Sequence, residues 1–82
     1  MYEVLWFQDA VDQLLELDSR DPRQARRVLT AVRTYGRDGR GDMKKLQGVG
    51  EWRLRTGDWR VRIALEGPKA HIISISNRRD AY

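Results

Sequence analysis

Apolar and polar residues alternate with a period of two from Glu51 to Leu65, in the stretch EWRLRTGDWRVRIAL, on both sides of a central Gly-Asp pair. Such alternation is typical of half-buried strands, and two of them separated by two turn residues indicate a β-hairpin. Gly57 stands at the first turn position, where a positive φ suits the tight turn. The stretch therefore predicts strands over 51–56 and 59–65.

Counting outward from the turn sets the register of this predicted hairpin. It places Arg55 opposite Arg60 and Arg53 opposite Arg62, so that four arginines share one face. Like charges directly opposite each other destabilise a sheet by up to about 1 kcal/mol per pair. Two such pairs favour a surface that binds phosphate. The simpler alternative is that the arginines extend into solvent or are balanced by acidic groups from elsewhere.

Apolar side chains occupy the opposite face of the predicted hairpin, which we assign to the core. A second core contribution is expected from a tryptophan near the amino terminus. The residues concerned are Trp6, Trp52, Leu54, Trp59, Val61 and Ile63.

Length and composition restrict the class of protein. Eighty-two residues predict a single domain over 1–82. The absence of cysteine excludes disulfides and thiolate metal sites, and His71 is the only histidine, so no multi-histidine centre is expected. No apolar run has the length of a membrane span and no signal peptide is visible, so we expect a cytoplasmic protein without a membrane partner.

The net charge of +4 is unevenly distributed along the chain. Residues 1–36 carry five basic and six acidic side chains, whereas residues 37–82 carry eleven basic and six acidic ones. Basic charge in the strand-rich half indicates a nucleic-acid or phosphate partner on that side.

The remaining elements follow from periodicity and from turn residues. A strand is predicted over 2–6, then an amphipathic helix that residues 18–20 break, and a second helix with Asp21 as N-cap and Gly36 as its end. Residues 37–42 predict a flexible loop, and a last strand is predicted over 70–76. The order β-α-α-β-β-β predicts an α+β fold, in which an antiparallel two-helix hairpin packs on one face of a mostly antiparallel sheet.

The hairpin motif resembles the RelE/ParE superfamily, the toxins of type II toxin–antitoxin systems. The motif reads aromatic-Arg-x-Arg-x-Gly-Asp-aromatic-Arg over residues 52–60, and it is followed by a buried strand and by the ending NRRDAY at 77–82. The resemblance covers essentially the whole chain, including the order of its predicted elements. It implies the RelE-like branch, whose members cleave messenger RNA in the ribosomal A site.

The resemblance also implies which residues form the active site. As catalytic residues it implies Arg53, Arg55, Arg60, Arg78 (or its neighbour Arg79) and Tyr82, and as RNA-binding residues Lys44, Lys45, Arg62 and Arg79. The implied reaction needs neither metal nor cofactor. The 2′-hydroxyl attacks the neighbouring phosphate, the 5′-oxygen leaves, and a 2′,3′-cyclic phosphate results.

Chemical properties assign a role to each of these groups. Arginine does not exchange protons at a useful rate, so Arg55 and Arg60 are expected to clamp the scissile phosphate. Tyr82 could act as general base or stack on a base of the message, and otherwise Lys44 or Lys45 or ribosomal groups would move protons. The sequence departs from the family pattern where arginines replace lysine and where Asn77 replaces a histidine.

The implied partners are a cognate antitoxin, the ribosome and messenger RNA, with toxin and antitoxin forming a hetero-oligomer. Two alternatives remain open at this point. One is a ParE-like protein that inhibits DNA gyrase without being an enzyme, and the other is an inactive RNA-binding relative.

Overall fold

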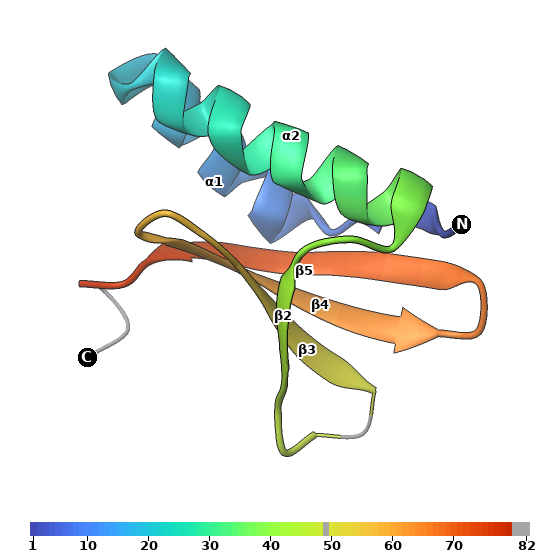
Figure 1. Cartoon of the computed structure of the whole chain (residues 1–82). Coiled ribbons are helices and arrows are strands. Elements are labelled where there is room, and N and C mark those ends of the chain that lie inside the picture. Colours follow the sequence, from blue (N-terminus) through green and yellow to red (C-terminus); the bar gives the residue numbers. More distant parts are fainter. Residues whose placement is uncertain (49, 80–82) are drawn as a thin grey trace.

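The computed structural model describes residues 1–48 and 50–79, and in this part of the chain five strands form one sheet. Their order is β1-β5-β4-β3-β2; β1 pairs with β5 in parallel and all other neighbours are antiparallel. Two helices cover one face of the sheet (Figure 1), which confirms the predicted α+β class. The elements are β1 (Glu3–Trp6), α1 (Gln8–Arg20), α2 (Pro22–Asp38), β2 (Asp42–Lys45), β3 (Glu51–Thr56), β4 (Trp59–Glu66) and β5 (Lys69–Asn77).

The predicted hairpin is confirmed residue by residue. Arg53 pairs with Arg62, Leu54 with Val61 and Arg55 with Arg60. Gly57 has a φ of +60°, as its position in the turn requires. One feature was not predicted: the pairing of β4 with β5 shifts between Arg62 and Ile63, which marks a β-bulge.

Residues 18–20 do not break the first helix, contrary to the prediction, but form its last turn. Ser19 donates a side-chain hydrogen bond to the Glu16 carbonyl at 2.7 Å, and the Asp21 N–H bonds the Leu17 carbonyl at 2.7 Å. Because these bonds satisfy the polar groups locally, the helix continues to Arg20. The second helix begins as predicted, with the Asp21 carboxylate accepting from the Gln24 N–H at 3.4 Å.

Gly36 does not end the second helix, contrary to the prediction. The helix continues to Asp38, and Gly39 ends it with a φ of +70° and an N–H bonded to the Tyr35 carbonyl at 2.8 Å. Gly36 lies inside the helix, where α2 passes close to β1, and a Cβ there would lie 2.5 Å from Val4 Cγ2. Close helix–strand packing is the reason for this glycine.

The predicted loop 37–42 is shorter than expected because both of its ends belong to regular structure. Arg37 and Asp38 are helical, and Asp42 begins β2, a strand that the sequence did not predict. β2 contains a single apolar residue, Met43, which packs against the core, so it carries too little alternation to be recognised.

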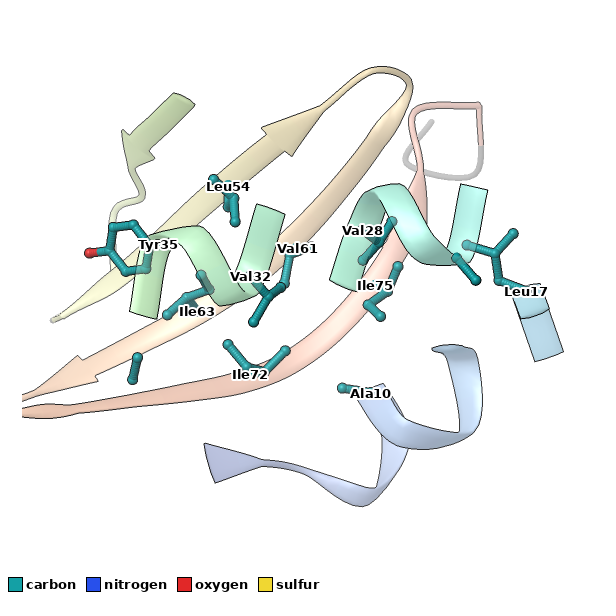
Figure 2. Packing of buried hydrophobic residues seen from close by; sticks show 12 residues of the cluster. Ala10, Leu17, Val28, Val32, Tyr35, Leu54, Val61, Ile63, Ile72 and Ile75 are labelled. Atoms are coloured by element: carbon teal, nitrogen blue, oxygen red, sulfur yellow. The ribbon is translucent and has the colours of Figure 1, made fainter. Parts of the chain in front are cut away.

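The core lies between the helices and the sheet (Figure 2). Val28 and Val32 of α2 are fully buried together with Leu54, Val61 and Ile63 of the hairpin. Trp6 and Trp59 are half-buried and pack against this cluster, and Trp52 is half-buried near the β2–β3 loop. The predicted apolar face is therefore confirmed except at Trp52, which lies at the end of β3 and outside the core cluster. Among the described residues, no helix has the length and hydropathy that crossing a bilayer requires.

Candidate nucleic-acid interface

The four hairpin arginines lie on the sheet face that the helices leave uncovered. We call Arg53, Arg55, Arg60 and Arg62 the arginine face. They alternate along β3 and β4 with Leu54 and Val61, which are buried under the helices. The predicted shared face is thus confirmed.

Pairing across four strands arranges the polar residues of this face in two rows. The first row, from β2 to β5, consists of Asp42, Arg55, Arg60 and Ser76. The second row consists of Lys44, Arg53, Arg62 and Ser74. Each row therefore joins cationic groups at its centre to a serine hydroxyl at its β5 end, and hydroxyls can donate to an anion.

Two arginines of the face are paired with carboxylates of adjacent strands. Arg55 Nε donates to Asp42 Oδ2 at 2.8 Å. Arg62 donates to Glu51 Oε1 from Nε at 3.0 Å and from Nη2 at 2.6 Å. Acidic groups therefore balance two of the four arginines, which is the alternative that the sequence left open.

Arg53 and Arg60 have no ion pair among the described residues, and both line a hollow of about 300 Å³. We call this hollow the arginine pocket; its lining consists of Leu46, Arg53, Arg60, Arg62, Ser74 and Ser76. Arg60 Nε is buried, and no atom of the described residues accepts a hydrogen bond from it. A buried donor without an acceptor costs about 1–3 kcal/mol, so a side-chain movement of Arg60 that brings this N–H to an anion in the pocket would relieve the deficit.

The arginine pocket is chemically suited to a phosphate group. Guanidinium groups bind phosphate oxygens with paired N–H donors, and hydrogen bonds between charged groups are stronger than neutral ones. Ser74 and Ser76 add neutral donors on one side. Among the described residues, no cluster of acidic or histidine side chains could hold a metal ion.

The two predicted lysines separate onto different faces. Lys44 lies opposite Arg53 and extends the arginine face across β2. Lys45 follows the same alternation as Met43, which packs against the core, so it stands on the helix side of the sheet, opposite Trp52.

The predicted residues after β5 lie at the hairpin turn rather than in the arginine pocket. Arg78 Nη1 is 3.8 Å from Asp58 Oδ1, and the Arg78 N–H bonds the Asp58 carbonyl at 2.8 Å. Arg79 lines a different hollow, on the helix side. Tyr82 lies outside the described residues.

Two kinds of site residue were missed in the sequence. Ser74 and Ser76 interrupt an otherwise isoleucine-rich strand at alternate positions, which was a recognisable signal for a polar face. The carboxylates of Asp42 and Glu51 gave no such signal. Asp42 contacts Arg55 because β2 pairs with β3, and Glu51 contacts Arg62 diagonally across the β3–β4 pair.

Comparison with known proteins reveals similarity in structure alone. No family model matches the sequence, and no curated protein matches it significantly. The RelB–RelE antitoxin–toxin complex from Methanococcus jannaschii superposes with a TM-score of 0.71 at 15% identity, over 95% of this chain and 94% of that one. A chain of the YoeB–YefM complex from Staphylococcus aureus has a TM-score of 0.73 at 13% identity, over 93% of this chain and 95% of that one.

A third similar structure is the YoeB/ParE toxin from Agrobacterium tumefaciens, with a TM-score of 0.73 and 20% identity over 94% of this chain and 98% of that one. These similarities extend over nearly the full length of each chain, while the identities are low. The resemblance seen in the hairpin motif is therefore matched by the whole architecture, and this chain has the fold of the RelE, YoeB and ParE toxins.

Proposed function

We propose that this protein is the toxin of a type II toxin–antitoxin system and an endoribonuclease that cleaves messenger RNA in the ribosomal A site. The observation that carries the proposal is the arginine pocket, which Arg53 and Arg60 line without an ion pair among the described residues. The shared fold supports it, because a structurally similar chain is a toxin in complex with its antitoxin.

In the proposed reaction, Arg60 and Arg53 hold the scissile phosphate. The 2′-hydroxyl oxygen forms a bond to phosphorus, the bond to the 5′-oxygen breaks, and a 2′,3′-cyclic phosphate and a 5′-hydroxyl are produced. The guanidinium groups stabilise the charge that develops on the phosphate oxygens in the transition state. Removal of the 2′-proton and its delivery to the leaving oxygen fall to Tyr82, Lys44 or groups of the ribosome.

Arg55 and Arg62 serve, in this proposal, as the second layer of phosphate contacts. Each must exchange its carboxylate partner, Asp42 or Glu51, for an RNA oxygen. Arg78 and Arg79 lie beyond the pocket and are proposed to contact the message or the ribosome. The proposed antitoxin would cover the arginine face, and its acidic groups would compete with phosphate for the same donors.

Primer extension on a defined transcript in a purified translation system tests the proposal. Cleavage inside codons that appears only when ribosomes are present is the expected result. A transcript with a 2′-deoxynucleotide before the cleaved bond should resist cleavage at that bond, because the attacking hydroxyl is missing. Absence of cleavage with ribosomes would contradict the proposal, and inhibition of gyrase supercoiling would then identify the ParE-like alternative.

A further inference from the structure

A second basic surface lies on the helix side of the molecule, away from the arginine face. A hollow of about 690 Å³ lies between the α1–α2 junction, the β3–β4 turn and the end of β5, and three arginines line it: Arg20, Arg27 and Arg79. A hollow of about 490 Å³ adjoins it through Arg27 and adds Arg23 and Arg26. We call these five residues the helix-side arginine surface.

The guanidinium groups of this surface form no direct polar contacts within the part of the chain that the structure describes. Among the described residues, no ion pair and no side-chain hydrogen bond involves any of the five guanidinium groups. Two carboxylates also line the larger hollow: Asp21, which caps α2, and Asp58, which lies 3.8 Å from Arg78, so the three arginines there are in excess by one charge.

Acidic and basic side chains are separated between the two helices. The net charge of residues 1–36, which is near zero, does not reveal this separation. α1 carries four carboxylates, and α2 places Arg23, Arg26 and Arg27 in its first turns. Like charges three and four residues apart on a helix destabilise it by about 0.2–0.5 kcal/mol per pair. The arrangement resembles the opposed arginines of the hairpin, and it again indicates an anionic partner.

Packing between the hairpin and α2 fixes the framework of the larger of these two hollows. A Cβ on Gly57 would lie 2.5 Å from Arg27 Nη1, so the guanidinium of Arg27 rests on the hairpin turn. Trp59 Nε1 donates to Gln24 Oε1 at 3.1 Å, which ties the hairpin to α2 on the floor of the hollow. The position of Arg27 is therefore set by packing against the hairpin turn.

We propose that the helix-side arginine surface binds the phosphate backbone of folded RNA at a site separate from the arginine pocket. Nucleic-acid interfaces are polar and strongly basic, and contacts to phosphate do not depend on base sequence. Protein partners, in contrast, usually need aromatic or aliphatic anchors at the centre of the interface. In the larger hollow the indole N–H of Trp59 is already bonded and Leu17 is buried in the core, so polar groups dominate its lining.

Binding to an RNA duplex of about 16 base pairs, the length that a small double-stranded RNA-binding domain spans, tests this inference. Fluorescence anisotropy would compare the wild type with the double variant Arg23→Gln/Arg27→Gln over a range of salt concentrations. Both side chains are exposed and glutamine is a good helix former, so the fold is kept; circular dichroism checks this. The matched control is Arg33→Gln/Lys69→Gln, which removes the same charge from exposed positions outside both hollows.

The expected result is a loss of about tenfold in affinity for Arg23→Gln/Arg27→Gln, with a salt slope shallower by about 0.9 for each lost phosphate contact. The control should stay near the wild type. Equal losses in both double variants would overturn the inference, since only net charge would then matter. Polyglutamate that binds the wild type as tightly as the duplex would also overturn it, in favour of an acidic protein partner.

This inference is independent of cleavage at the arginine pocket. Because the arginine face can also contact phosphate, Arg60→Ala should lose less duplex affinity than Arg23→Gln/Arg27→Gln, whereas its cleavage of messenger RNA should be lost. A loss of duplex affinity in Arg60→Ala as large as that in Arg23→Gln/Arg27→Gln would place both activities on one surface and contradict a separate site.

Discussion

Arg60 is the residue on which the candidate site depends most. It stands between Arg55 and Ser76 in one row of the sheet, and its Nε is buried with no acceptor among the described residues. Arg55 and Arg62 are less committed to a ligand, because Asp42 and Glu51 already occupy some of their donors. Arg60 can therefore bind phosphate without losing an ion pair, whereas Arg55 and Arg62 must first release a carboxylate.

Glu51→Gln should strengthen RNA binding, because it removes the charge that competes for Arg62. An exposed ion pair contributes up to about 1 kcal/mol, which corresponds to a gain of at most about fivefold in affinity. Anisotropy with a short single-stranded RNA measures the effect. Glu16→Gln is the matched control, since it removes the same charge from an exposed position on α1. Unchanged or weaker binding by Glu51→Gln would show that Glu51 does not compete with RNA.

The raised pKa of Tyr35 predicts how the free energy of unfolding changes at alkaline pH. Burial raises the pKa of its phenol from 10.0 to about 12, with a further contribution from the hydroxyl of Tyr2, whose ring stacks on it at 5.3 Å. The folded state thus keeps this proton at a pH where the unfolded chain loses it. The associated stability is fully present below pH 10 and is lost as pH rises towards 12.

Denaturant titrations at several values between pH 9 and about pH 12 test this dependence. Tyr35→Phe keeps the aromatic ring but has no proton to lose, so its free energy of unfolding should fall less steeply above pH 10 than that of the wild type. Parallel curves for the two proteins would mean that Tyr35 is not the group responsible.

The sequence predicted the positions of the four arginines but not their pairing with carboxylates. Alternation around Gly57 is local, so the register of Arg53 with Arg62 could be counted from the turn. The contact between Glu51 and Arg62 is diagonal and lies beside a bulge in the β4–β5 pairing, which no local pattern encodes.

At the level of elements, close packing decides boundaries that turn residues alone do not. Gly36 has the appearance of a helix end, yet it continues α2 because Val4 of β1 lies where its Cβ would be. β2 exists because β3 offers it a partner edge, although Met43 is its only apolar residue. Both errors of prediction arose from contacts between segments distant in the sequence.

Gly36→Ala should destabilise the protein in spite of the better helix propensity of alanine. The gain in propensity is up to about 1 kcal/mol, whereas overpacking against Val4 Cγ2 typically costs about 1–3 kcal/mol. Combining it with Val4→Ala makes room for the new methyl group. We expect Gly36→Ala to be neutral or stabilising in that background.

A double-mutant cycle of urea denaturation measures this coupling. If Gly36→Ala lowers the free energy of unfolding equally in the wild-type background and in the Val4→Ala background, steric contact with Val4 is not the reason for the glycine.

At the level of the whole molecule, the sheet separates two basic surfaces. The arginine face lies on the uncovered side, and the helix-side arginine surface lies by the α1–α2 junction and the hairpin turn. A protein that cuts RNA inside a ribosome must both hold the scissile phosphate and stay in contact with surrounding RNA. The two surfaces divide these tasks in the proposed account, with the shared RelE-like fold as their framework.

The most direct measurement is the rate at which Arg60→Ala cleaves messenger RNA on translating ribosomes, relative to the wild type and to Arg33→Ala. If Arg60 stabilises charge on the phosphate in the transition state, its removal should lower the rate by about 10²–10³-fold. Arg33 is exposed on α2 and lines neither surface, so Arg33→Ala should cleave at the wild-type rate. Equal rates for Arg60→Ala and the wild type would contradict the assignment of the arginine pocket as the active site.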